Sequence, residues 1–188
     1  MLNDPVEKKP LAHFMSGTRT YSISTVGCNL SCLHCQNWGI SQVGVEEYPY
    51  EEKTAEEVLI DAVSSECSSI SYTYTEPTIF FEFMRDVAKI ANERGIKNIF
   101  VSNGYINEKP LIELCKYVDA ANIDIKGDDR FYSEVCGGIS REPVLRSLKV
   151  LKQENIHIEI TYLIIPTYND DLKDFEEICK WIKKELGE

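Results

Sequence analysis

Residues 26–37 read Val-Gly-Cys-Asn-Leu-Ser-Cys-Leu-His-Cys-Gln-Asn, which places three cysteines in one short stretch. Cys28, Cys32 and Cys35 have the spacing C-x3-C-x2-C. Cubane iron–sulfur clusters are held by cysteine thiolates, normally four of them, and this stretch supplies three. A cluster with three protein ligands leaves one iron open to bind a substrate or cofactor directly. The spacing therefore indicates a catalytic cluster rather than an electron carrier.

Three other interpretations of these cysteines stay open from the spacing alone. Positions i, i+4 and i+7 also share one face of a helix, although the glycine, asparagine and serine between the cysteines favour a loop. A zinc site would need a fourth ligand, and His34 is awkwardly placed to provide it. A thioredoxin-like dithiol at Cys32 and Cys35 would leave Cys28 unused.

Length, charge and hydropathy limit the class of protein. The chain has 188 residues, of which 43% are apolar, and this suits one domain with a full core. A net charge of −11 disfavours binding to nucleic acid, whose phosphates require clustered Lys and Arg. The chain shows no apolar signal peptide and no stretch that approaches a membrane span. We therefore expect a cytoplasmic protein with no membrane partner and with reduced cysteines.

Strand and helix patterns alternate along the chain. Strands are expected at residues 21–26, 69–74, 97–102, 120–125 and 156–165. Helices are expected between them and at the end, with a capping box at Thr54 and Glu57, a helix from Pro77 to Gly95, and a last helix capped by Asp170 or Asp171. This alternation predicts an α/β fold with a parallel sheet covered by helices. Long runs of such units close, or partly close, into a barrel with active groups at the C-terminal strand ends.

Polar side chains alternate with apolar ones on three of the expected strands. Since successive residues of a strand point to opposite faces, these polar residues share one face of the sheet. Burying an unpaired charge costs several kcal/mol, so charged residues on a buried face usually have a structural or functional role. One interpretation is a structural ion pair between Asp124 and Lys126, and the other is a polar pocket for a large zwitterionic cofactor. The polar residues are Ser71, Thr73, Thr75, Asn122, Asp124, Lys126, His157, Glu159 and Thr161.

Residues outside the cysteine stretch also indicate a protein family. Together with the cysteine spacing, they resemble the radical S-adenosylmethionine (radical SAM) proteins of the AmmeMemoRadiSam system, which are relatives of the pyruvate formate-lyase activating enzyme. The resemblance implies a partial (β/α)6 TIM-like radical SAM barrel, here about five βα units. Residues 1–19 would form an N-terminal extension and residues 20–188 a core that stops before the sixth strand, so we expect a fragment. The segments that carry the resemblance are Glu7–Leu11, Gly27–Leu30, Cys35–Trp38 and Tyr72–Pro77.

The resemblance also implies which residues bind cofactors. Cys28, Cys32 and Cys35 would hold a [4Fe-4S] cluster, and no residue is assigned to catalysis. The residues that would contact S-adenosyl-L-methionine are His34, Asn37, Thr75, Glu76, Asn103, Asp124 and Lys126.

These implied contacts have ordinary structural alternatives. His34 fills an aromatic position that lies against the adenine in relatives, but it could also only pack the loop. Glu76 follows Thr75 where relatives have Gly-Gly-Glu, and it could only favour the first turn of a helix. Asn103 belongs to an Asn-Gly pair that could be a plain turn. Asn37 could hydrogen-bond near the cluster or only cap the next turn.

The resemblance implies an enzyme that cleaves S-adenosyl-L-methionine reductively to a 5′-deoxyadenosyl radical, which abstracts hydrogen from a protein or small-molecule substrate. Activation of a glycyl-radical enzyme is an alternative within this class. A non-catalytic iron–sulfur or zinc protein is the alternative from another class. The implied partners are a flavodoxin- or ferredoxin-type reductant and a protein substrate or the partner proteins of the AmmeMemoRadiSam system.

Overall fold

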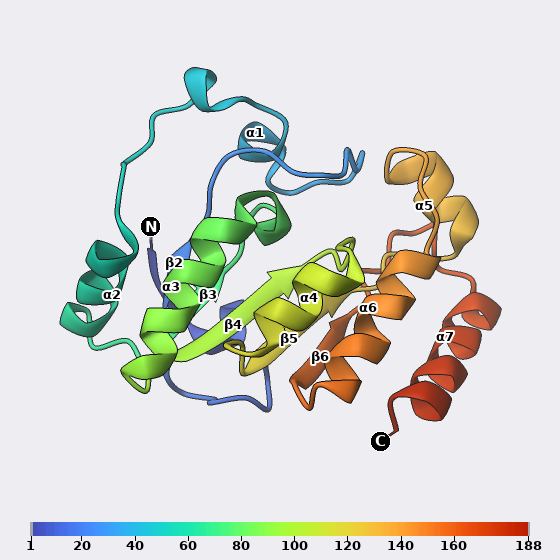
Figure 1. Cartoon of the computed structure of the whole chain (residues 1–188). Helices are drawn as coiled ribbons and strands as arrows, with labels where there is room; N and C mark the ends of the chain where they lie inside the picture. Colours follow the sequence, from blue (N-terminus) through green and yellow to red (C-terminus); the bar gives the residue numbers. More distant parts are fainter. Residues whose placement is uncertain (1, 188) are drawn as a thin grey trace.

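The computed structural model describes residues 2–187 and contains one six-stranded sheet with helices on one side (Figure 1). The strand order is β1-β2-β3-β4-β5-β6, so each strand lies beside its neighbour in sequence. Strands β2 to β6 are parallel, and β1 pairs with β2 in the antiparallel direction. The strands are β1 (Leu2–Pro5), β2 (Arg19–Ile23), β3 (Ser69–Tyr72), β4 (Lys97–Ser102), β5 (Ala120–Asp124) and β6 (His157–Thr161).

The parallel strands are connected by helices, as the alternating pattern predicts. The predicted α/β class and the partial barrel are confirmed, because five parallel strands follow one another without closing on themselves. The helices are α1 (Trp38–Ser41), α2 (Ala55–Ser64), α3 (Phe81–Glu93), α4 (Glu108–Cys115), α5 (Asp129–Val135), α6 (Glu142–Gln153) and α7 (Leu172–Glu185). None of the helices within residues 2–187 is long and apolar enough to cross a membrane.

Local signals in the sequence explain where the helices begin and end. Thr54 accepts a hydrogen bond from the Glu57 backbone N–H, and the Glu57 carboxylate accepts one from the Thr54 N–H, so the predicted capping box begins α2. Asp171, rather than Asp170, caps α7. Gly95 follows α3 with a φ of +73°, in the left-handed region that favours glycine. Pro77 begins a short 3₁₀ turn, after which α3 starts at Phe81.

Strand β6 ends at Thr161, four residues before the predicted end at residue 165. The side chain of Asn169 explains the difference. Its amide group donates to the backbone oxygens of Leu163 and Lys126, and its carbonyl oxygen accepts from the Ile165 N–H. Because these backbone groups are satisfied by a side chain, the segment after β6 turns away instead of extending the strand.

The sequence pattern missed β1 and α5. Strand β1 contains Asn3, Asp4 and Pro5, which are all depleted in strands. It forms because Asp4 finds buried partners in Ser22 of β2 and in Lys9. Helix α5 spans seven residues, too few for a clear apolar period, and Asp128 caps it by accepting from a backbone N–H.

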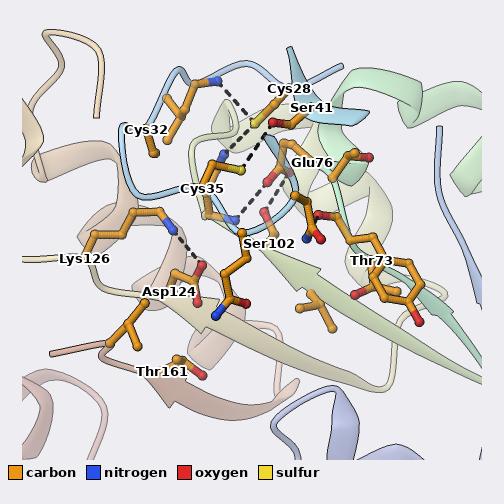
Figure 2. A pocket seen from close by; sticks show the side chains of 18 of the residues that line it. Cys28, Cys32, Cys35, Ser41, Thr73, Glu76, Ser102, Asp124, Lys126 and Thr161 are labelled. Carbon is orange, nitrogen blue, oxygen red and sulfur yellow. Dashed lines mark hydrogen bonds and ion pairs between the residues drawn. The ribbon is translucent and has the colours of Figure 1, made fainter. Parts of the chain in front are cut away.

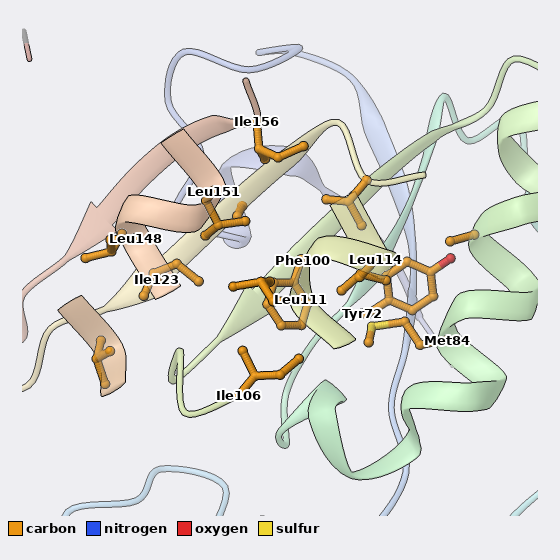
Figure 3. Packing of buried hydrophobic residues seen from close by; sticks show 14 of the residues in the cluster. Tyr72, Met84, Phe100, Ile106, Leu111, Leu114, Ile123, Leu148, Leu151 and Ile156 are labelled. Carbon is orange, nitrogen blue, oxygen red and sulfur yellow. The ribbon is translucent and has the colours of Figure 1, made fainter. Parts of the chain in front are cut away.

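The main hydrophobic core lies between the sheet and its helices. Figure 3 shows Tyr72, Phe100 and Ile123 of the strands packed against Met84 of α3 and Leu111 of α4. The opposite face of the sheet carries the polar alternation predicted from the sequence. A small second apolar cluster on that face joins the N-terminal segment to the sheet, and its buried members are Val6, Leu11, Ile99 and Ala120.

Candidate cofactor site

The cysteine stretch is a loop that follows β2, so the helix-face interpretation is wrong. Gly27 begins the loop with a φ of +93°, and its N–H donates to the Ile40 carbonyl at 2.8 Å. A side chain at this position would meet Ile79, which explains why glycine stands there. The loop closes over a cavity of about 570 Å³ at the C-terminal ends of the parallel strands (Figure 2).

All ten residues implied as cluster or cofactor contacts line this one cavity. They come from four parts of the chain: the cysteine loop, the segments that follow β3 and β4, and the end of β5 with the residues after it. They are Cys28, Cys32, Cys35, His34, Asn37, Thr75, Glu76, Asn103, Asp124 and Lys126. Ser41 and Ser102, which the sequence did not single out, also line the cavity, as do Lys8 and Tyr74 from two of the segments that carry the resemblance.

The first and third cysteines have hydrogen-bond donors around their sulfurs. The Leu30 N–H donates to Cys28 Sγ at 3.4 Å, and the Asn103 amide lies 3.9 Å from the same sulfur. Ser41 Oγ is 3.3 Å from Cys35 Sγ. In the absence of a metal, burial raises the pKa of Cys28 to about 11. Because metal ligands must be deprotonated, binding at this cysteine releases a proton.

The chemistry of the three cysteines fits an iron–sulfur cluster. The ligands of a cubane each bind a different iron, so three thiolates can hold three of its four irons. All three cysteines carry free thiols and line the same cavity, which is the donor set that a cluster needs.

Glu76 is a buried carboxylate at the end of β3, with 2% of its surface exposed. It accepts hydrogen bonds from the Thr78 N–H, from Ser102 Oγ at 2.8 Å and from the Asn103 N–H at 2.9 Å. Burial nevertheless raises the pKa of Glu76, and the hydrogen bonds only partly offset this effect. Glu76 thus caps the turn after β3, as its structural interpretation predicts, and it also faces the cavity.

Asp124 and Lys126 form an ion pair at the end of β5, with 2.7 Å between Lys126 Nζ and Asp124 Oδ2. Burial alone would lower the pKa of Lys126, but attraction to Asp124 outweighs it and the pKa is raised. The two interpretations of this pair are therefore compatible, because the ion pair exists and both residues line the cavity.

His34 and Asn37 sit on the same loop in different surroundings. The His34 ring packs against Phe131 of α5, with 5.4 Å between ring centroids, and burial lowers its pKa. Among residues 2–187, no group forms a hydrogen bond with the buried His34 Nδ1. The Asn37 amide donates to the Tyr74 carbonyl at 2.6 Å, which ties the loop to the end of β3.

Thr75 also connects the cysteine loop to the sheet. Its hydroxyl donates to the Thr25 carbonyl at 2.8 Å, so this side chain joins the ends of β2 and β3. Thr75 therefore has a structural role of its own.

The chain is similar in sequence to several known proteins. An uncharacterised protein of Methanocaldococcus jannaschii is 50% identical over 184 residues, which cover 98% of this chain and 54% of that protein. The pyruvate formate-lyase 1-activating enzyme of Escherichia coli K12 is 26% identical over 153 residues, 77% of this chain and 61% of that enzyme. The chain thus spans little more than half the length of these relatives.

A solved structure described as native anSMEcpe with bound AdoMet shares the fold, with a TM-score of 0.65 and 16% identity over 87% of this chain and 48% of that one. The family model of the radical SAM superfamily matches residues 22–182. Members of this superfamily use a [4Fe-4S] cluster and S-adenosylmethionine, the two cofactors predicted from the sequence. The cysteine loop, the partial barrel and this match together show that the chain belongs to the radical SAM superfamily.

Proposed function

We propose that this chain is the cofactor-binding core of an enzyme that cleaves S-adenosylmethionine reductively and abstracts hydrogen from a substrate. The observation that carries the proposal is the convergence on one cavity of ten residues from four separate parts of the chain. Active groups of βα barrels gather at the C-terminal strand ends, and this cavity lies there. The 26% identity to a formate-lyase activating enzyme over most of the chain supports the same class of reaction.

Cys28, Cys32 and Cys35 would hold the cluster. When bound, the cluster and S-adenosylmethionine supply the electron and the C–S bond cleavage that give methionine and a 5′-deoxyadenosyl radical. The chain's own part is to hold three thiolates in one loop and to direct donors at their sulfurs, among them Ser41 at Cys35. Outer donors of this kind orient metal ligands and tune the metal.

The remaining cavity residues match the polar groups of S-adenosylmethionine. The Glu76 carboxylate would accept hydrogen bonds from the α-ammonium group. Lys126 would attract the α-carboxylate, with Asp124 holding the lysine in place. His34 lines the cavity, and its ring would lie against the adenine. Asn37 and Asn103 would hold the loop and the end of β4 around the cofactor.

Two classes of protein substrate are candidates. Several relatives are named as activating enzymes of other enzymes. One of them is the 4-hydroxyphenylacetate decarboxylase activating enzyme of Clostridium scatologenes, which is 25% identical over 117 residues. A glycyl-radical protein is therefore one candidate. The second candidate is the set of AmmeMemoRadiSam partner proteins, which the resemblance of the sequence implies. A flavodoxin- or ferredoxin-type protein would supply the electron in both cases.

Anaerobic reconstitution with iron and sulfide tests the proposal. About four irons should bind per chain, as in a cubane cluster. S-adenosylmethionine should alter the EPR spectrum of the reduced cluster, and dithionite should then yield 5′-deoxyadenosine. Cys35→Ala should abolish that product, while Cys115→Ala, in α4 outside the cavity, should retain it. Zinc as the bound metal, or unchanged turnover in Cys35→Ala, would contradict the proposal.

A further inference from the structure

Lys8 contributes an ammonium group to the wall of the cavity, and the proposed function gives this group no role. It belongs to the segment after β1, from which Pro10 also lines the cavity. This segment crosses the polar face of the sheet. The Pro10 carbonyl accepts from Asn122 Nδ2 of β5 at 3.0 Å, and Glu159 of β6 accepts from the Ala12 N–H at 2.7 Å. The segment is therefore tied to the sheet and forms a fixed part of the cavity wall.

Lys8 shares the carboxylate of Asp4 with a second lysine. Lys8 Nζ lies 2.8 Å from Asp4 Oδ1, and Lys9 Nζ lies 2.8 Å from Asp4 Oδ2. The hydroxyl groups of Ser22 and Tyr74 also donate to Asp4 Oδ2. Two ammonium groups thus meet one carboxylate, and this cluster of residues has one positive charge in excess.

The two lysines differ in their exposure. The side chain of Lys8 is 53% exposed, whereas that of Lys9 is 1% exposed. An ammonium group has three N–H donors, and one donor of Lys8 is directed to Asp4 Oδ1. The hydrogen bond with Asp4 raises the pKa of Lys8, so the group stays charged at neutral pH. Lys8 can therefore donate to a molecule in the cavity while it stays paired with Asp4.

Lys8 lies on the other side of the cavity from Lys126, the residue that would attract the α-carboxylate of S-adenosylmethionine. Lys8 Nζ is 5.7 Å from the ring centroid of Tyr74, which follows β3. Asp124, the partner of Lys126, ends β5, which is two strands from β3 in a sheet whose neighbouring strands are about 4.8 Å apart. Figure 2 shows Thr73 across the cavity from Asp124 and Lys126. The two lysines therefore face different parts of the cavity.

We propose that Lys8 is a specificity-determining residue that binds an anionic group of the substrate, either a carboxylate or a phosphate. This inference rests on the proposed function, which assigns Lys126 to the cofactor and leaves the side of Lys8 for the substrate. An anion bound there would accept a charge-assisted hydrogen bond from Nζ and would neutralise the excess charge around Asp4. A substrate held at Lys8 would present its remaining atoms to the cofactor.

Anion binding to the reconstituted protein loaded with S-adenosylmethionine tests this role. The probes are succinate, glycerol 3-phosphate and the neutral succinamide, measured by isothermal titration calorimetry. Lys8→Met should weaken binding of the preferred anion at least about tenfold, because a charge-assisted hydrogen bond is lost. Lys8→Arg keeps the charge and should retain most of the affinity. Succinamide should not distinguish the variants.

Lys149→Met is a matched control for the loss of a lysine. Lys149 Nζ also lies 2.8 Å from a carboxylate, that of Glu185, and 5.7 Å from an aromatic ring centroid, that of Trp181. Because Lys149 lies on α6 outside the cavity, its replacement should leave anion binding unchanged. Lys8→Met should keep the melting temperature of the wild type, since Lys9 still pairs with Asp4, and Lys8→Gln provides a second neutral variant.

Each result has its own meaning. Tighter binding of succinate identifies a carboxylate as the ligand, and tighter binding of glycerol 3-phosphate identifies a phosphate. The role of Lys8 is overturned if neither anion binds the wild type, or if the wild type and the neutral variants bind equally. A weaker affinity for S-adenosylmethionine in Lys8→Met would also overturn it, because Lys8 would then belong to the cofactor site. The proposed function fails by a separate result, a wild-type chain that assembles no cluster.

Discussion

Asn103 Nδ2 lies 2.8 Å from Asn29 Oδ1 and joins the end of β4 to the cysteine loop. The other end of the Asn103 amide accepts a hydrogen bond from the Tyr105 N–H, which fixes the orientation of the side chain. The Asn29 amide in turn donates to the Tyr105 carbonyl. The loop that carries Cys28 is therefore held to the sheet by a closed set of hydrogen bonds rather than by the cysteines alone.

Removal of this connection should loosen the cluster more than the fold. Asn103→Ala breaks three side-chain contacts near Cys28, so we expect the reconstituted cluster to be lost several times faster to a chelator. The free energy of unfolding should fall by only about 1 to 3 kcal/mol. Asn107→Ala is a suitable control, because Asn107 precedes α4 without a side-chain cap. Equal rates of iron release in both variants would contradict this prediction.

Glu76 should matter for cofactor affinity. In Glu76→Gln one acceptor oxygen is replaced by an NH₂ donor, which disfavours both the backbone N–H of Asn103 or Thr78 and an incoming ammonium group. We expect the dissociation constant of S-adenosylmethionine to rise about 10- to 100-fold, measured by equilibrium dialysis with the reconstituted protein. Glu159→Gln provides the control, since Glu159 also accepts from backbone N–H groups but lies outside the cavity.

Much of the fold was predictable because its strands carry strong local patterns. Strand β4 was predicted at residues 97–102 and forms at Lys97–Ser102, where β-branched and aromatic residues follow one another. Strand β1 was not predictable, since its residues disfavour a strand and its partners are distant in sequence. The short β6 depends on the Asn169 side chain, which no periodicity reveals.

In the site, too, residues marked by a local sequence pattern could be predicted, whereas residues brought together only by folding could not. The cysteines could be found because their spacing is local, and the strand-end residues because they resemble a known family. Ser41 was missed because it is a common residue whose contact with Cys35 depends on the placement of a short helix.

Lys126 should bind the cofactor by its charge. Lys126→Met keeps most of the apolar stem but removes the ammonium group, so we expect the affinity for S-adenosylmethionine to fall at least about tenfold, or 1.4 kcal/mol. The matched control is Lys97→Met. Lys97 begins β4, away from the cavity, and its ion pair with Asp119 has the same length as the pair between Lys126 and Asp124. A similar loss in both variants, or none in Lys126→Met, would show that the charge at Lys126 does not recognise the cofactor.

Asp4 should give the fold a pH dependence at acid pH. Burial alone raises its pKa, but hydrogen bonds from Lys8, Lys9, Tyr74 and Ser22 outweigh burial and hold the pKa well below its usual range. A carboxyl group whose pKa is lower in the folded state stabilises the fold above its unfolded pKa of about 3.9. That contribution is lost as the pH falls toward the pKa of the folded state.

Asp4→Asn tests this assignment by urea denaturation at several pH values. The substitution leaves the buried Lys9 ammonium without its counter-charge, so unfolding should become easier by about 3 kcal/mol at pH 7. The difference from wild type should stay constant down to about pH 5 and shrink below about pH 4. Asp170→Asn, at an exposed position, should differ little from wild type at any pH. A difference at Asp4 that does not change with pH would contradict the ionic role.

The turn after α5 contains two adjacent glycines that allow its contact with the cysteine loop to be tested. Both glycines have a left-handed backbone conformation, but only one of them lies close to the loop. Gly137 and Gly138 have φ values of +97° and +81°. A Cβ on Gly137 would lie 2.5 Å from Ser31 Oγ, whereas a Cβ on Gly138 would meet nothing within 4 Å. Alanine at either position introduces backbone strain of about 1 kcal/mol, but only Gly137→Ala also pushes the turn away from the cysteine loop.

We therefore expect Gly137→Ala to lower the free energy of unfolding by about 1 to 3 kcal/mol more than Gly138→Ala, measured by urea denaturation. Gly137→Ala should also lose the reconstituted cluster faster, because Ser31 lies directly before Cys32. Ser31→Gly combined with Gly137→Ala removes the clashing hydroxyl and should restore most of the difference. If the two single alanine variants behaved alike, the close approach of the turn to the loop would not contribute to stability.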